Sequence, residues 1–160
     1  MTSGTDRDQA KMQVLRWLRH GEIPRARADA RLQEKGFDTV VIDGVLAELV
    51  ETGILDDARC AESLVNAWCR SGPMAARELE RRLVERGIDS ELAASASMAA
   101  GNVDELEDAL SLARKRLGRL GNLPRNVAAR RLFEYLARRG YEEDTACRTL
   151  DALGLSTEED

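Results

Sequence analysis

The sequence predicts an all-α protein, built as three tandem three-helix repeats in an elongated, curved array. Its composition favours helix: the chain is rich in Ala, Leu, Arg and Glu, 43% of its 160 residues are hydrophobic and only 4% are aromatic. One pattern, Leu-x-x-basic-Gly-apolar-acid, occurs at residues 32–38, 83–89 and 136–142. A pattern that recurs at nearly constant intervals predicts helical units that stack and bury a shared core.

Each copy of this pattern encodes the end of one helix and the start of the next. Glycine adopts the left-handed conformation at little cost and so ends a helix, and the apolar residue after it packs on the leucine four positions before the glycine. The expected pairs are Phe37 on Leu32, Ile88 on Leu83, and Tyr141 on Leu136. Asp38 and Asp89 suit the N-cap of the next helix, whereas Glu142 caps poorly but is favourable near a helix N-terminus.

Three prolines mark the start of the helix that precedes each of these glycines. Pro24, Pro73 and Pro124 are the only prolines in the chain, and proline favours the first turn of a helix. Each proline and the glycine after it therefore bracket the middle helix of one repeat. The flanking amphipathic helices are expected at residues 8–20, 38–52, 56–70, 89–100, 104–119 and 142–153.

A fourth stop signal separates the first two repeats. Gly53 is followed by Ile54, which can pack on Leu49, and Asp56 or Asp57 can cap the helix that comes next. Capping explains this acidic pair better than a magnesium site, because the sequence places no third acid nearby. The expected repeats are residues 8–55, 56–103 and 104–155, with flexible tails at residues 1–7 and 156–160.

Charge and cysteine content argue against several classes of protein. The net charge is −5, from 24 basic and 29 acidic residues, whereas an autonomous DNA-binding domain usually carries a basic excess. No apolar run approaches the roughly 18 residues of a membrane helix, and the N-terminus lacks the apolar region of a signal peptide. Cys60, Cys69 and Cys147 do not have metal-binding spacing, and His20 is the only histidine. We expect reduced thiols in a cytoplasmic protein that needs no metal or cofactor.

Three segments resemble the motifs of one known family. Residues 53–61, Gly-Ile-Leu-Asp-Asp-Ala-Arg-Cys-Ala, are similar to the G-[YFL]-[LI]-D-D-x-x-[FY]-A motif of the RecX regulatory proteins. Residues 82–89 are similar to that family's E-L-x-x-K-G-I, and residues 130–141 to its R-x-L-x-x-x-L-x-R-R-G-[FY]. The resemblance covers roughly residues 12–153, and Cys60 stands where the family usually has an aromatic residue.

The resemblance implies a regulatory protein rather than an enzyme. RecX proteins bind the RecA recombinase, lie in the helical groove of its nucleoprotein filament, and inhibit its ATPase and strand-exchange activities. Some also bind DNA weakly, and the family needs no cofactor. By this resemblance we expect a monomer that acts on RecA in DNA repair, in recombination and in the SOS response.

The basic residues are the candidates for a partner-binding surface. In the middle helix of the third repeat, Arg130, Arg131 and Arg138 share a face on which only Glu134 opposes them. A guanidinium can bind a carboxylate or a phosphate with two parallel hydrogen bonds. This face is therefore expected to contact RecA or phosphate, and the alternative is a solvated charged surface. Arg139 is expected nearer the apolar side, where its alkyl stem can cover the core.

The middle helix of the second repeat carries four further candidates on two flanks of its apolar face. These candidates are Arg77 and Arg81 on one flank and Arg82 and Arg86 on the other. Glu78 with Arg82, and Arg81 with Glu85, can form ion pairs within the helix. A solvated, self-paired helix is therefore the stronger interpretation of these four. The basic cluster at residues 114–119 is explained by the helix dipole, because its helix begins with acids.

Two other functions remain open from the sequence. Three-helix units with a sharp glycine turn can resemble helix-turn-helix domains, so a nucleic-acid-binding module is the main alternative. A helical scaffold for an unrelated acidic or helical partner is the second. Trp17 and Trp68 lie on apolar helix faces and are expected in the core rather than as platforms for base stacking.

Overall fold

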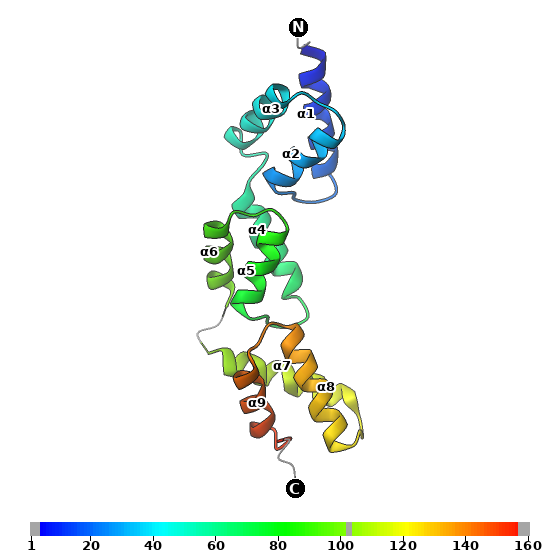
Figure 1. The fold of residues 1–160 in the computed structure, drawn as a ribbon, viewed down its shortest axis with the longest axis vertical. Coiled ribbons are helices and arrows are strands. Elements are labelled where there is room, and N and C mark those ends of the chain that lie inside the picture. Colours follow the sequence, from blue (N-terminus) through cyan, green and yellow to red (C-terminus); the bar gives the residue numbers. More distant parts are fainter. Residues whose placement is uncertain (1–3, 102–103, 157–160) are drawn as a thin grey trace. The chain divides into compact units, whose positions relative to one another are not determined.

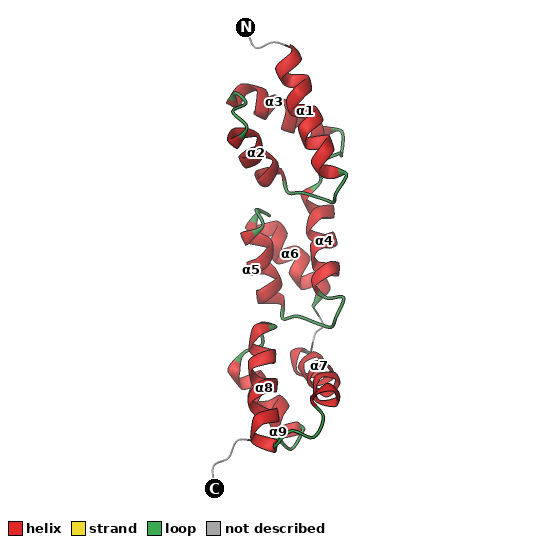
Figure 2. Cartoon of the chain, turned by 90° about the vertical axis from the view of Figure 1, so that its right-hand side faces the viewer, coloured by secondary structure: helices red, strands yellow, loops and turns green. Residues whose placement is uncertain are grey.

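The computed structural model describes residues 4–101 and 104–156, and in these residues all the regular secondary structure is α-helix. Figure 2 shows helices and loops but no strand in the described residues, which confirms the all-α prediction. In order, the helices are α1 (Gly4–Leu18), α2 (Arg25–Glu34), α3 (Thr39–Glu51), α4 (Asp57–Trp68), α5 (Ala76–Glu85), α6 (Ser90–Ala100), α7 (Glu105–Leu120), α8 (Arg125–Arg138) and α9 (Glu143–Ala152).

Two helix starts differ from the sequence prediction. Helix α1 begins at Gly4, so residues 4–7 form its first turn rather than part of a flexible tail. Arg7 in this turn forms an ion pair with Glu48 of α3, with 2.9 Å between Nη2 and Oε2. Pro24 and Pro124 directly precede α2 and α8, but Pro73 lies three residues before α5. The other tail prediction, at residues 156–160, falls outside the described residues except for Ser156.

Glycine turns end α2, α5 and α8 as the sequence predicts. Gly36, Gly87 and Gly140 have φ values of +83°, +96° and +88°, which side-chain-bearing residues rarely adopt. The residue after each glycine closes the turn with a backbone hydrogen bond from its N–H. These bonds run from Phe37 to the carbonyl of Leu32 at 3.2 Å, from Ile88 to Leu83 at 3.0 Å, and from Tyr141 to Leu136 at 3.2 Å.

At Gly53 the turn is closed by the second residue after the glycine and not, as predicted, by the first. Leu55, not Ile54, donates its N–H to the carbonyl of Leu49, at 2.9 Å. The side chain of Leu55 is buried and that of Ile54 is 37% exposed. The prediction that Ile54 packs on Leu49 is therefore wrong: both candidates are apolar, and the backbone geometry of the turn selects the second.

Aspartate side chains cap the helices that follow the turns. Asp38 accepts from the N–H of Val40 at 2.8 Å, and Asp56 accepts from that of Arg59 at 3.1 Å, as predicted. Asp57 instead accepts at 2.9 Å from the N–H of Arg25, the first residue of α2. This bond gives α2 a side-chain cap that the proline before it cannot supply.

The chain has two compact units. The first unit takes the described residues of Met1–Leu64 and Arg82–Ala96, and the second takes those of Val65–Arg81 and Ser97–Asp160. In the first, α1, α2 and α3 pack around one core, and in the second α7, α8 and α9 pack around another (Figure 1). Trp17 packs against the first core, as expected. The division of the chain into three repeats stays a prediction.

In the second unit, the glycine turn between α8 and α9 packs against the segment that leads into α5. A Cβ added to Gly140 would overlap the Cβ of Glu78 and lie 3.1 Å from its Cγ and 3.4 Å from the Cβ of Ala75. The N–H of Ala75 donates to the carbonyl of Arg139 at 3.0 Å. The guanidinium of Arg139 donates in return to the carbonyl of Pro73, with Nε at 2.9 Å. Only glycine fits this close approach.

A similar but looser contact occurs in the first unit. A Cβ on Gly87 would lie 3.3 Å from the Cβ of Ala26 and 3.9 Å from the backbone nitrogen of Arg27. The turn at Gly36 differs, because a Cβ there would meet nothing within 4 Å. The same motif therefore ends a helix in three places and makes tertiary contacts around its glycine in two of them.

Candidate partner-binding surface

The outer face of α8 carries the arginines that the sequence singled out. Arg130, Arg131 and Arg138 are all exposed. Arg130 lies 3.9 Å from Glu134, and both side chains are more than half exposed, so this pair adds little stability. Arg131 and Arg138 make no ion pair or hydrogen bond with any residue that the structure describes. Their guanidiniums are therefore available to a carboxylate or a phosphate.

The opposite face of α8 holds this surface in place. Its buried residues are Ala128, Ala129, Leu132 and Leu136. They follow the helical period, so burying them in the second core directs the arginines to solvent. Leu132 and Leu136 are completely buried, which makes α8 a rigid support for the exposed side chains.

Two of the predicted arginines on α5 bind within the fold. The Nε of Arg77 donates to the carbonyl of Gly140 at 2.7 Å, and its Nη1 forms an ion pair with Glu142. Arg81 binds both carboxylate oxygens of Glu78, at 2.8 and 2.9 Å. These bonds give the two guanidiniums a structural role in the second unit, and a role toward a partner stays a prediction.

The remaining predicted arginines of α5 belong to the other compact unit. Arg82 is half-buried and Arg86 is exposed, and both fall in the first unit, whereas Arg77 and Arg81 fall in the second. The seven predicted residues therefore do not form a single cluster within one unit. Arg131 and Arg138, with Arg130 beside them, make the most coherent candidate surface.

Helix α7 adds basic residues that the helix-dipole interpretation left out of the candidate surface. Arg114, Lys115 and Arg119 are exposed and have no partner among the described residues. Arg116 differs, since its guanidinium lies over the ring of Tyr135, 5.1 Å from the centroid. The first three extend the set of basic residues that the second unit offers to a partner.

Arg139 has a role that the sequence analysis missed. Its side chain does more than cover the core, because the guanidinium binds the carbonyls of Gly72 and Pro73. A signal was present in the sequence: a basic residue precedes the glycine in every copy of the repeated pattern. What that residue binds could not be deduced, because its partners lie 66 and 67 residues away in the chain.

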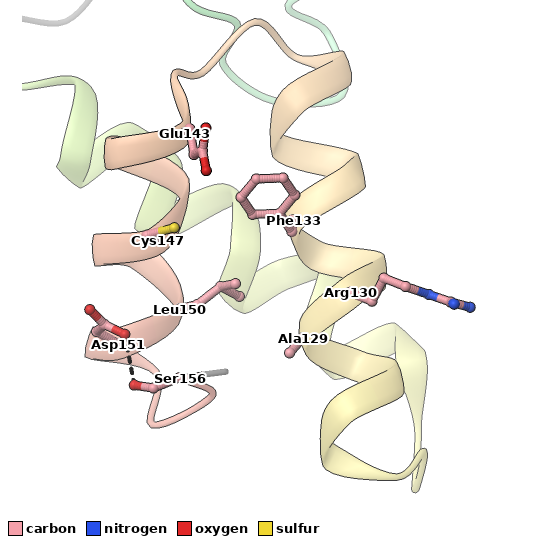
Figure 3. A pocket seen from close by; sticks show the side chains of 8 residues that line it. All are labelled: Ala129, Arg130, Phe133, Glu143, Cys147, Leu150, Asp151 and Ser156. Atoms are coloured by element: carbon pink, nitrogen blue, oxygen red, sulfur yellow. Dashed lines mark hydrogen bonds between the residues drawn. The ribbon is translucent and has the colours of Figure 1, made fainter. Parts of the chain in front are cut away.

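A groove between α8 and α9 lies beside the arginine face. It has a volume of about 610 Å³ and is open to solvent. Figure 3 shows Phe133 and Leu150 lining it between the two helices, while Arg130 points away from it. Ala129, the stem of Arg130, Glu143, Cys147, Asp151 and Ser156 complete the lining. Asp151 accepts a hydrogen bond from Ser156 at 2.7 Å, and both lie on the α9 side of the groove (Figure 3).

The three thiols have different environments, which predicts different reactivities. Cys147 is exposed in the groove, Cys69 is half-buried and Cys60 is completely buried. Burial, assisted by the charges of Asp57 and Glu22, raises the pKa of Cys60 to about 11. Because the thiolate is the reactive form, we expect a disulfide reagent at pH 8 to modify Cys147 rapidly, Cys69 more slowly, and Cys60 only after denaturation. Equal rates for all three in the native protein, measured by mass spectrometry, would contradict this placement.

The described residues show neither a metal-binding cluster nor a membrane-spanning helix. No group of three or more His, Cys, Asp or Glu side chains among them is placed to hold a metal ion. None of their helices is both long and apolar enough to cross a membrane.

The helices and their two cores define an all-helical protein built from three-helix units. A family model described as "RecX, third three-helix domain" matches residues 103–150, which include α7 and α8 and most of α9. The regulatory protein RecX of Amycolatopsis mediterranei is 36% identical over 126 residues, which cover 76% of this chain and 72% of the relative. That of Thermobifida fusca is 34% identical, and the match covers 94% of this chain and 83% of the relative. The chain belongs to the RecX family of regulatory proteins.

Solved structures of the family share the fold. The crystal structure of RecX from Lactobacillus salivarius superposes with a TM-score of 0.76, over 96% of this chain and 99% of that chain, at 18% sequence identity. A second crystal structure of a regulatory protein RecX superposes with a TM-score of 0.70, over 91% of this chain and 72% of that chain. These superpositions agree with the all-helical fold expected from the motifs.

Proposed function

We propose that this chain binds the RecA nucleoprotein filament and inhibits the ATPase, recombinase and strand-exchange activities of RecA. Membership of the RecX family supports a regulatory role. One observation carries the choice of surface: Arg131 and Arg138 lie on the exposed face of α8 with no partner among the described residues. An exposed guanidinium without such a partner can form two charge-assisted hydrogen bonds to a carboxylate of RecA or to a phosphate of the filament's DNA.

Charge reversal of these two arginines tests the proposal. We expect the R131E/R138E variant to need at least tenfold more protein for half-inhibition of RecA's ATPase on single-stranded DNA. The reason is that each charge-assisted bond contributes about 1.5–3 kcal/mol and about 1.4 kcal/mol corresponds to a factor of ten. The R19E/R70E variant is the matched control, because Arg19 and Arg70 are exposed and the same change in net charge occurs elsewhere. Unchanged inhibition by a folded R131E/R138E protein would rule out this surface.

A parallel titration separates this proposal from direct DNA binding. The anisotropy of labelled single-stranded DNA is followed without RecA at several salt concentrations. Inhibition of RecA at protein concentrations that leave free DNA unbound supports a filament regulator. Inhibition only at concentrations that coat the DNA, with a steep salt dependence, would favour the nucleic-acid-binding alternative.

A further inference from the structure

Two glycine turns pack on the start of an earlier helix. In the first compact unit, the turn at Gly87 lies against the start of α2, with 3.3 Å between a Cβ built on the glycine and the Cβ of Ala26. In the second compact unit, the turn at Gly140 lies against Ala75 and Glu78 at the start of α5. Each contact therefore has two halves: a glycine turn, and the start of a helix that itself ends in such a turn.

The turn at Gly36, after α2, is a glycine turn without this cover. Gly36 is exposed, and a Cβ there would meet nothing within 4 Å. Phe37, directly after the glycine, is half-buried, whereas Ile88 and Tyr141 at the same position of the other two turns are each 3% exposed. Among the described residues, the turn at Gly36 is therefore an open half of the repeated contact.

The start of α8 is the matching open half. Pro124 directly precedes the first residue of α8, as Pro24 precedes that of α2 and Ala75 that of α5. Pro24 and Ala75 are buried, but Pro124 is exposed, and so is Asn126 in the first turn of α8. In its described residues, the chain therefore carries one uncovered glycine turn and one uncovered helix start.

The contact in the second unit shows which side chains stabilise the two halves. Arg139, directly before the glycine, binds two carbonyls of the segment before α5. Arg77, the second residue of α5, binds the carbonyl of Gly140 and forms an ion pair with Glu142, two residues after the glycine. The contact thus uses a basic residue and an acid on the two sides of the glycine, and a donor in the first turn of the helix.

The two open halves carry groups of the same kinds. Lys35 directly precedes Gly36, Asp38 follows it by two residues, and both side chains are exposed. In α8, Asn126 is the second residue of the helix, the position that Arg77 holds in α5, and its amide is a hydrogen-bond donor. The turn therefore offers a cation and an acid, and the helix start offers a donor.

Arg125 adds a positive charge to the open start of α8. It is exposed, and its guanidinium makes no ion pair or hydrogen bond with any residue that the structure describes. A Cβ built on Gly154 would lie 3.5 Å from its Nη2, so the turn after α9 approaches this guanidinium without pairing with it. An arginine at one open half and an aspartate at the other make the two halves complementary in charge.

We propose that the turn at Gly36 of one molecule binds the start of α8 in a second copy of this chain. Gly36 lies against Pro124, where the absence of a side chain allows the close approach. Asp38 binds Arg125, and the ammonium of Lys35 binds carbonyls of the segment before α8. Because the two halves differ, the interface is heterologous and the copies join head to tail. This association goes beyond the proposed function and does not depend on RecA.

Sedimentation equilibrium of the full chain without RecA tests this association. A contact between one turn and one helix start is small and binds weakly, so the concentration runs from about 10 μM to about 1 mM. We expect the weight-average mass to equal that of the monomer at the lowest concentration and to rise steadily above it. A mass that stays that of the monomer throughout would overturn the proposal.

Variants that block one half each test which surfaces meet. G36N adds a side chain to the turn, and asparagine tolerates the left-handed backbone better than most residues do. N126E places a carboxylate opposite Asp38, although an acid in the first turn of a helix is otherwise favourable. Each variant alone should stay a monomer at the highest concentration. An equimolar mixture should form dimers that grow no further, because each variant supplies the half that the other lacks.

Matched controls separate blocking from unfolding. G53N also adds a side chain at an exposed glycine, with φ at +72° and nothing within 4 Å of a Cβ, and N66E makes the same charge change at an exposed residue of α4. Both should associate like the wild type. K35E leaves the glycine in place and should give the same result as G36N in the mixture. Mixtures that stay monomeric with both turn variants, or a blocked variant that associates with itself as the wild type does, would overturn the head-to-tail contact.

Discussion

Replacing Gly140 by alanine is expected to destabilise the second unit by about 2–5 kcal/mol. Two costs add in this variant. A residue with a side chain pays about 1–2 kcal/mol for the left-handed conformation that Gly140 adopts at φ +88°. The new Cβ also overlaps the Cβ of Glu78, and the shifts that remove such an overlap destabilise a fold by about 1–3 kcal/mol more. Equilibrium denaturation in urea, followed by circular dichroism, measures the loss.

Gly36 provides the matched control for this prediction. It has nearly the same backbone conformation, at φ +83°, but a Cβ there meets nothing within 4 Å. G36A should therefore pay only the conformational cost, about 1–2 kcal/mol. Equal losses for G36A and G140A would show that the turn between α8 and α9 does not pack against Glu78 in solution.

Truncating Leu132 to alanine is expected to produce the second large effect, a loss of about 2–5 kcal/mol. The side chain is completely buried in the core formed by α7, α8 and α9, so its removal leaves a cavity. Hydrogen exchange read by mass spectrometry shows where the stability is lost. We expect faster exchange in residues 65–81, 97–101 and 104–156, which are the described residues of the second unit, and little change in residues 4–64.

The corresponding truncation in the first core is L46A, since Leu46 is also completely buried. It should speed exchange in residues 4–64 and 82–96. Faster exchange along the whole chain in both variants would mean that the protein unfolds as one cooperative unit. If the L132A effect were confined to α7, α8 and α9, the three predicted repeats, rather than the two compact units, would be the units of unfolding.

Local signals explain why so much of the fold could be predicted from the sequence. Many of these helices end at a glycine with positive φ and several start at a capping aspartate, and both signals involve residues only a few positions apart. Gly36, Gly87 and Gly140 are therefore recognisable in the sequence, as are the caps at Asp38 and Asp56. The same turn closes after α9, where Leu155 donates to the carbonyl of Leu150 at 2.8 Å, although the sequence analysis did not use that signal.

Long-range contacts explain what the sequence could not predict. The position of Arg77 on its helix is typical of a solvated surface residue. Its guanidinium nevertheless binds Gly140 and Glu142, which lie 63 and 65 positions away in the chain. Arg139 likewise binds the segment before α5. The groove is made by Phe133 of α8 and Leu150 of α9, and each has only the periodicity of an ordinary helix face. Helix spacing places a side chain on a face, but only the packing of two helices shows whether that face is buried, paired or open.

Two residues of α4 stabilise α2 and the loop before it, although the expected first repeat ends before α4 begins. Asp57 caps the N-terminus of α2, and Arg59 binds Glu22 with 2.7 Å between Nε and Oε1. Both lie beyond position 55, where the first expected repeat ends. A segment of residues 8–55 would lack Asp57 and Arg59, and with them both of these contacts. Each helix unit is thus stabilised in part by residues that the sequence period assigns to its neighbour, and cutting the chain at position 55 would remove that stabilisation.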